Sequence, residues 1–96
     1  DMIDTAGTIS NAAKIAKEKG ALSVTVAATH GIFSSNALDK LSDDIVDTIF
    51  ITDTIDMSNK EGCKKLKKIS SAKIFAETIN RIHNGESVSQ LFRKVT

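Results

Sequence analysis

Runs of apolar residues alternate along this chain with segments of helical periodicity, and this alternation constrains the fold more than any other feature. The two clearest runs, residues 22–28 and 47–52, are nearly continuous in apolar character, as expected of buried strands. Helical patterns occupy residues 9–20 and 71–84. Because strands separated by helices pair in parallel, the sequence predicts an α/β fold, a parallel sheet with flanking helices.

Shorter elements fill the intervals between these four segments. We expect loops at residues 1–8 and 29–35, and a short helix at residues 36–42. A polar, lysine-rich segment begins at Asp53 and is predicted to be a solvated loop with a helical turn, and residues 66–70 to form a third strand. The helix at 71–84 has an apolar stripe and ends at Gly85, and a final turn is expected at 87–92.

Size and charge exclude several classes of function. With 96 residues the chain forms at most one small domain, and we expect no domain boundary within residues 1–96. A net charge of +1 argues against a nucleic-acid or membrane-surface binder, and no apolar run is long enough to cross a bilayer. The one cysteine, Cys63, has no internal disulfide partner, which favours a reducing, cytoplasmic setting.

The sharpest chemical signal is the segment Asp4, Thr5, Ala6, Gly7, Thr8, which leads into the first helix. A phosphate needs several convergent donors, and the N–H groups at the start of a helix supply them. Small residues keep that backbone accessible, and the two threonines add hydroxyl donors. An ordinary helix N-cap by the aspartate or a threonine explains the same residues equally well.

Two acidic residues flank this loop. Because carboxylates repel a phosphate, Asp1 and Asp4 are expected to face hydroxyl groups or a metal instead. Asp1 is suited to accept hydrogen bonds from ribose hydroxyls, whereas Asp4 does the same or caps local N–H groups. A phosphate loop normally follows a strand of the sheet, and none is evident before residue 1, so we expect a domain that lacks its first strand.

Four motifs in sequence order resemble the ribose-phosphate pyrophosphokinases (PRPP synthetases). They are DMIDTAGT at residues 1–8, THGIFS at 29–34, DTIFITDTI at 47–55 and HNGESVSQLF at 83–92. The resemblance implies that residues 1–96 are part of the C-terminal domain of such an enzyme, with a sheet of the type I phosphoribosyltransferase kind. It also implies that residues 4–8 wrap the 5-phosphate of ribose 5-phosphate, and that Asp1 is the second of two adjacent acids that hold the ribose hydroxyls.

The same resemblance implies an activity. A PRPP synthetase transfers the pyrophosphoryl group of ATP to the 1-hydroxyl of ribose 5-phosphate, giving PRPP and AMP, with Mg²⁺ as cofactor. It implies a cytoplasmic homo-oligomer. The catalytic residues, the ATP-binding segments and most Mg²⁺ ligands are expected outside these residues, so we expect the chain alone to be inactive.

The C-terminal motif implies a second site. Ser87, Val88, Ser89 and Phe92 match a segment that binds phosphate or a nucleoside diphosphate at a subunit interface in regulated PRPP synthetases. Taken alone, Ser87 and Gln90 form a capping box, and this interpretation carries equal weight.

Other candidate residues have simpler explanations. His30 follows a strand and is expected to have a structural role, and His83 suits a helix C-terminus. Cys63 and the lysines between 60 and 68 are expected to be a solvated edge without metal or catalytic chemistry. Two alternatives to a synthetase remain, a non-catalytic regulatory relative and a phosphoribosyltransferase that consumes PRPP.

Overall fold

A computed structural model describes residues 1–41, 44–60 and 63–93 of the chain. The strands are β1 (Met2–Ile3), β2 (Thr25–Ala28), β3 (His30–Gly31), β4 (Thr48–Thr52) and β5 (Leu66–Ile69). The helices are α1 (Gly7–Glu18), α2 (Ala37–Leu41) and α3 (Ala72–His83), with two 3₁₀ turns, η1 (Ser58–Lys60) and η2 (Ser89–Phe92). None of these helices has the length and apolar character to cross a membrane.

The strands form two parallel groups, as the alternation predicted. β2, β4 and β5 make one sheet in that order, with Val26 opposite Ile49 and Ile49 opposite Leu66. β1 pairs with β3. The buried residues come from these strands, from α1 and α2, and from the loops beside them: Ile3, Ala6, Ala13, Val26, Phe33, Ala37, Leu41, Val46, Ile49, Ile51 and Met57. The core therefore lies between the strands and the two N-terminal helices, and the α/β prediction is confirmed.

Only one face of the larger sheet is covered in the part of the chain that the structure describes. Along β4, Ile49 and Ile51 are buried, whereas Phe50 between them is 36% exposed. The predicted strand at residues 22–28 begins only at Thr25, and Leu22 is almost fully exposed. The expectation of fully buried strands is therefore wrong, because none of the helices that the structure describes lies on the second face.

Two very short strands were not predicted. The segment 1–8, expected to be a loop without a strand, contains β1, and the loop predicted at 29–35 contains β3. The backbone N–H groups of Ile32 and Phe33 both donate to the carbonyl of Ile3, at 2.9 and 3.2 Å. A two-residue strand is too short to show a periodicity of two, so the pattern could not reveal it.

Close packing at the end of β3 requires a glycine. A Cβ placed on Gly31 would lie 2.5 Å from Cε2 of Phe33 and 2.9 Å from Cδ1 of Ile51. Phe33 itself has a φ of 50°, and its side chain is buried. The segment after β3 is therefore held tightly against β4.

The segment from Asp53 to Lys68 is less solvated than predicted. The predicted helical turn is present as η1, and the third strand is present as β5. Met57, however, is only 4% exposed and belongs to the core. One apolar side chain thus anchors a segment whose composition is otherwise polar.

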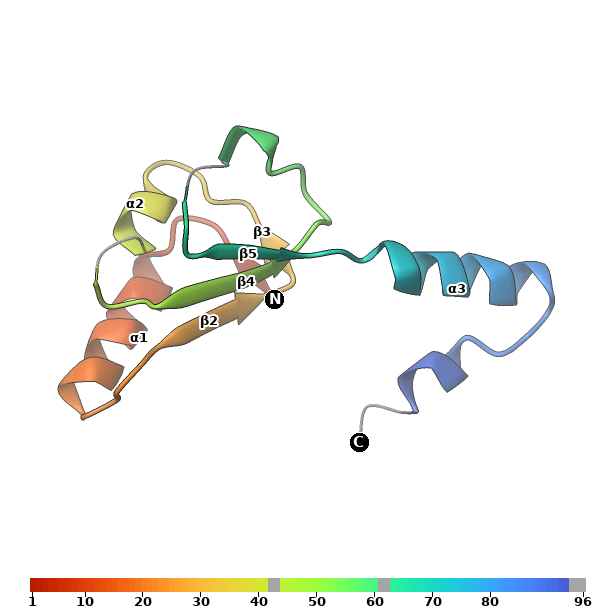
Figure 1. Cartoon of the computed structure of the whole chain (residues 1–96), viewed down its shortest axis with the longest axis horizontal. Coiled ribbons are helices and arrows are strands. Elements are labelled where there is room, and N and C mark those ends of the chain that lie inside the picture. The colour runs from red at the N-terminus through yellow and green to blue at the C-terminus, as the bar shows by residue number, and fades with distance from the viewer. Residues whose placement is uncertain (42–43, 61–62, 94–96) are drawn as a thin grey trace.

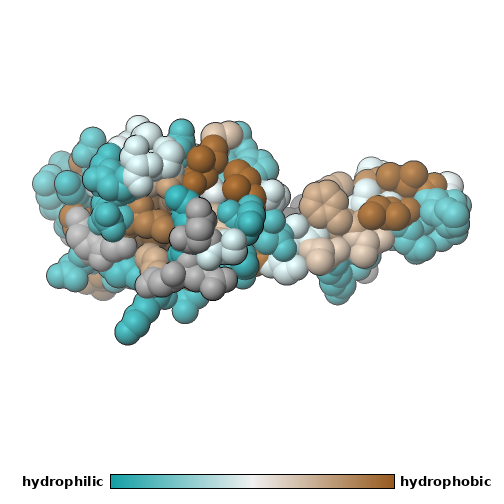
Figure 2. Space-filling model, turned by 90° about the horizontal axis from the view of Figure 1, so that it is seen from above, coloured by the Kyte–Doolittle hydropathy of each residue, from teal (hydrophilic) through white to brown (hydrophobic). Residues whose placement is uncertain are grey.

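The helix α3 projects away from the rest of the molecule (Figure 1). The radius of gyration is 16.4 Å, whereas a compact domain of this length has about 12.5 Å. None of the residues of α3 is buried, and the predicted apolar stripe of Phe75, Ile79 and Ile82 is exposed. Figure 2 shows this apolar surface along the arm that α3 forms.

Candidate phosphate-binding site

The loop at residues 4–7 lies where parallel sheets usually bind ligands. It follows the carboxyl end of β1 and leads directly into α1, and the carboxyl end of β3 is next to it. In α/β folds the crevice beyond the carboxyl ends of parallel strands is the common ligand site. The structure therefore places the phosphate-loop candidates at a suitable edge of the fold.

The start of α1 has no side-chain cap. The N-cap residue is Ala6, with a left-handed φ of 66°, and among the described residues no side-chain capping hydrogen bond is present. Of the two interpretations of this segment, the one in which the aspartate or a threonine caps the helix is therefore wrong. The first N–H groups of a helix have no partner inside the helix, and an anion placed there is stabilised by these groups and by the helix dipole.

A small hollow lies at this helix start. Its volume is about 140 Å³, and it is lined by residues 2–9, which include the five predicted phosphate-binding residues. Thr5, Ala6, Gly7 and Thr8 are thus brought together around one space. Gly7 has no side chain and no neighbour within 4 Å of the position that a Cβ would take, so the backbone is open there.

Asp4 lines the hollow but makes no capping hydrogen bond to the start of α1. Its Oδ1 accepts a hydrogen bond from the hydroxyl of Ser34, which follows β3. Ser34 belongs to the THGIFS motif, to which the sequence analysis assigned no contact with the loop. A bond between residues thirty positions apart leaves no trace in local periodicity.

A lysine reaches the loop from α2. The Nζ of Lys40 lies 3.4 Å from the carbonyl oxygen of Thr5. Residues 1–8 contain two carboxylates and no cationic side chain. Since the C=O and the following N–H of a trans peptide point in opposite directions, Lys40 lies behind the loop and the N–H of Ala6 faces away from it. Sequence reasoning missed Lys40 because nothing local links it to Thr5.

Asp1 lies at the same edge, next to His30. The backbone N–H of His30 donates to the carbonyl of Asp1 at 2.9 Å, and its Nε2 lies 3.8 Å from Oδ1 of Asp1. Nδ1 of His30 is 2.7 Å from Oγ1 of Thr54. The Asp1 carboxylate is largely exposed, and Asp1 also borders a hollow of about 330 Å³ that it forms with Thr29, with Thr52 and with other residues of β2, β4 and β5.

The C-terminal candidates are not part of this site. Ser87 and Ser89 follow α3, and the segment after this helix lies away from the N-terminal end of the chain (Figure 1). Their hydroxyl oxygens are 2.8 Å apart. Val88 is the N-cap of η2, and Phe92, at its end, is 59% exposed. The structure thus brings the serines together with each other but not with the phosphate loop.

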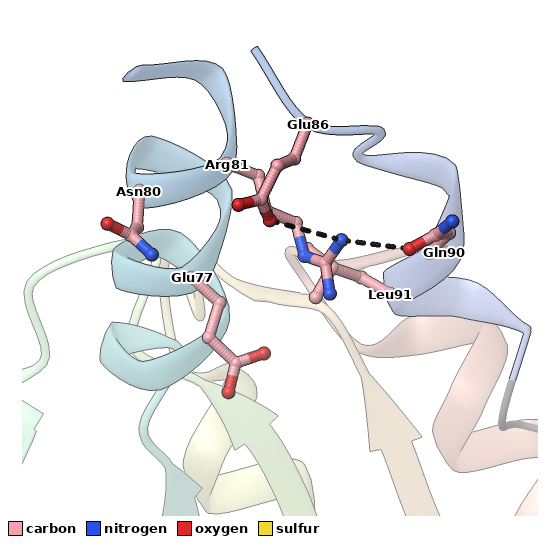
Figure 3. Close-up of a pocket in the computed structure, with 6 residues that line it drawn as sticks. All are labelled: Glu77, Asn80, Arg81, Glu86, Gln90 and Leu91. Atoms are coloured by element: carbon pink, nitrogen blue, oxygen red, sulfur yellow. Dashed lines mark hydrogen bonds and ion pairs between the residues drawn. The ribbon is translucent and has the colours of Figure 1, made fainter. Parts of the chain in front are cut away.

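Arg81 holds this C-terminal segment against α3. Its Nη1 donates to the carbonyl of Ser87 at 3.0 Å and to Oε1 of Gln90 at 3.2 Å, and lies 3.9 Å from Oε2 of Glu86 (Figure 3). A polar hollow of about 360 Å³ lies between α3 and η2 around these residues. No side chain caps η2. The predicted Ser87–Gln90 capping box is therefore wrong, because Gln90 bonds Arg81 and Ser87 bonds Ser89.

The remaining candidates lie apart from both regions. His83 is in the last turn of α3, and Cys63 is half-buried just before β5. Among the residues that the structure describes, no three His, Cys, Asp or Glu side chains form a group that could hold a metal ion.

Comparison with known proteins gives a consistent result. The family described as "Phosphoribosyl synthetase-associated domain" matches residues 1–93. The ribose-phosphate pyrophosphokinase of Chlorobaculum tepidum is 45% identical over 92 residues, which are 96% of this chain and 28% of that protein. The one from Gloeobacter violaceus is 46% identical over 93 residues, 97% of this chain and 28% of that protein.

A solved structure agrees with this assignment. The fold matches the crystal structure of phosphoribosylpyrophosphate synthetase from Mycobacterium smegmatis with a TM-score of 0.84 and 34% sequence identity. The match covers 88% of this chain and 28% of that one. The chain thus spans between a quarter and a third of the length of the relatives that it matches. With a family match over nearly its whole length, the chain belongs to the phosphoribosyl synthetase-associated domain family.

Proposed function

We propose that the protein to which these residues belong transfers the pyrophosphoryl group of ATP to the 1-hydroxyl of ribose 5-phosphate, giving PRPP and AMP. The names of the relatives support this activity. Because the chain covers 28% of their length, its own part in the reaction is narrower. That part is to hold the acceptor, ribose 5-phosphate.

The observation that carries this role is the uncapped start of α1. Ala6 takes a left-handed conformation, no side chain caps the first turn, and the hollow beside it is lined by residues 2–9. In our proposal the N–H groups of Ala6, Gly7 and Thr8 and the hydroxyls of Thr5 and Thr8 donate to the 5-phosphate. The positive end of the helix dipole stabilises the same charge.

Asp1 and Asp4 then take the ribose side of the ligand. Asp1 is exposed at the neighbouring strand end, and its carboxylate accepts hydrogen bonds from the ribose hydroxyls in this proposal. The Oδ1 of Asp4 is held by a hydrogen bond from the hydroxyl of Ser34 and not by the start of α1. Neither carboxylate therefore needs to face the phosphate. This matters because the negative charge of each would repel it.

The chemical step requires groups that we assign to the rest of the protein. Because the chain covers 28% of the length of its relatives, we propose that the ATP-binding segments and most Mg²⁺ ligands lie in the rest of the protein. The 96-residue chain is expected to release no AMP from ATP and ribose 5-phosphate. AMP release by the chain, above that of a heat-treated control, would contradict this division of roles.

A regulatory site is the second part of the proposal. Ser87, Val88, Ser89 and Phe92 would bind phosphate or a nucleoside diphosphate at an interface of a cytoplasmic homo-oligomer. The paired serine hydroxyls and the exposed ring of Phe92 support such a site. The exposed stripe of α3 supports an oligomer, because a large apolar surface on a helix is normally covered.

The binding role is tested by titrating the protein with ribose 5-phosphate. Thr8→Ala removes one hydroxyl donor, and a hydrogen bond to a charged group contributes about 1.5–3 kcal/mol, so the dissociation constant should rise by roughly 10- to 100-fold. Thr25→Ala, an exposed threonine on β2, is the matched control and should leave binding unchanged. Equal affinity of wild type and Thr8→Ala would contradict the proposed site.

A further inference from the structure

We infer that Ser34 is a positioning residue, which holds the Asp4 carboxylate away from α1 and so keeps the first N–H groups of this helix available to a phosphate. The inference rests on the proposed function of the loop. It assigns a role to the THGIFS segment, which contacts the loop without lining the hollow at the helix start.

Three kinds of contact hold the backbone just before Ser34 in place. The N–H groups of Ile32 and Phe33 donate to the carbonyl of Ile3. The Nζ of Lys60 donates to the carbonyl of Phe33 at 2.5 Å. The Phe33 side chain is buried in the core. From this fixed position the half-buried Ser34 donates its hydroxyl hydrogen bond to Oδ1 of Asp4.

Without Ser34, the Asp4 carboxylate has other partners nearby. Ala6 is two residues further along the chain and Gly7 three, and aspartate side chains readily accept hydrogen bonds from backbone N–H groups at these spacings. Aspartate is also among the preferred residues for satisfying the free donors at a helix start. Yet α1 has no side-chain cap. The hydrogen bond from Ser34 accounts for this, because it competes with the helix N–H groups for the Asp4 carboxylate.

A carboxylate bound to the start of α1 would weaken phosphate binding for two reasons. A carboxylate that caps α1 occupies the N–H groups that the phosphate needs, and its negative charge repels the incoming dianion. The stabilisation of a helix by an aspartate cap corresponds to about a fivefold change in an equilibrium constant. Releasing Asp4 should therefore weaken phosphate binding by about fivefold.

A double-mutant cycle tests this coupling, with inorganic phosphate as the probe and its dissociation constant read from the amide shifts of residues 5–8, because phosphate lacks the ribose hydroxyls that Asp4 is proposed to hold. Ser34→Ala is expected to raise the dissociation constant about fivefold. Asp4→Ala should not raise it, and the double variant should bind phosphate as Asp4→Ala does. Ser34→Thr, which keeps the hydroxyl, should bind like the wild type, and Ser35→Ala serves as the neighbouring control.

The amide proton shifts of the ligand-free protein provide a second test, which requires no measurement of affinity. In the ligand-free protein, the amide protons of Ala6 and Gly7 should shift downfield in Ser34→Ala, because a carboxylate accepts from them. This shift should be absent in the double variant.

The outcomes separate the inference from the proposed function. An equal loss of affinity from Ser34→Ala in both Asp4 backgrounds would overturn the inference, because Ser34 would then act on the fold alone. Unchanged affinity and unchanged amide shifts would overturn it as well. A wild type that binds neither phosphate nor ribose 5-phosphate would instead overturn the proposed function, and the inference with it.

Discussion

The carboxylate of Asp53, just beyond β4, accepts two hydrogen bonds from Ser71, one from its backbone N–H at 2.9 Å and one from its hydroxyl. Ser71 is the N-cap residue of α3. This pair ties the start of the projecting helix to the end of the neighbouring strand, so α3 leaves the sheet in a defined direction.

These two bonds make the Asp53 carboxyl a stronger acid in the folded protein. The hydroxyl and then the backbone N–H of Ser71 lower the pKa of Asp53 below its ordinary value of 3.8. The protein should therefore gain stability from this group above pH 3.8 and lose it as the pH falls through the folded-state pKa.

A carbon-13 NMR titration of the Asp53 carboxyl measures this shift. The midpoint should lie below 3.8 in the wild type. It should move upward in Ser71→Ala, which loses the hydroxyl bond but keeps the backbone bond. A wild-type midpoint at or above 3.8 would show that the pair does not form in solution.

Gly31→Ala should destabilise the fold. The added methyl would sit 2.5 Å from Phe33 and 2.9 Å from Ile51, both of which are buried. Overpacking of this kind costs about 1–3 kcal/mol. Urea unfolding followed by circular dichroism should show a lower midpoint at an unchanged slope.

Gly7→Ala is the matched control for this substitution. Nothing lies within 4 Å of the position that the added methyl group would take, so the unfolding midpoint of Gly7→Ala should not fall. If both variants unfolded at the wild-type urea concentration, the close packing of β3 against β4 would be contradicted.

Lys40→Met should weaken the binding of ribose 5-phosphate, because it removes the cation that lies behind the phosphate loop. A surface charge interaction contributes up to about 1 kcal/mol, so the loss should be at most about fivefold and should shrink as salt is added. Lys14→Met changes the net charge equally but alters an exposed residue of α1, and it should have a smaller effect. Equal effects of the two substitutions would show that Lys40 acts only through net charge.

Ser87→Ala and Ser89→Ala test the proposed regulatory site in the whole protein. Removing either hydroxyl breaks the pair at 2.8 Å and removes a donor to an anion. Inhibition by ADP and activation by phosphate should both weaken, while activity without effectors stays near the wild-type value. Effector responses that match the wild type in both variants would remove these serines from the site.

Much of the fold followed from the sequence because periodicity reports local structure well. β4, β5, α1 and α3 lie close to their predicted positions, since each has enough residues to show a pattern. The two-residue strands β1 and β3 do not. The exposure of Phe50 and Leu22 was also unforeseen, because an apolar run does not reveal whether a second layer covers it.

The candidate site divides in the same way. The residues that line the hollow at the start of α1 could be predicted, because they are contiguous and share one physical purpose. Ser34 and Lys40 could not, since they reach the loop only through the fold. The capping box of Ser87 and Gln90 was predicted from spacing alone. It does not form, because the Gln90 side chain accepts a hydrogen bond from Arg81 instead.

The most direct test of the account is a nitrogen-15 NMR titration of the protein with ribose 5-phosphate. We expect saturable shifts that are largest at the amides of Thr5, Ala6, Gly7 and Thr8, and small at those of Ser87 and Ser89. Inorganic phosphate should perturb the same four loop amides, with lower affinity. Shifts confined to other parts of the chain, or none at the start of α1, would contradict the claim that this loop holds the 5-phosphate.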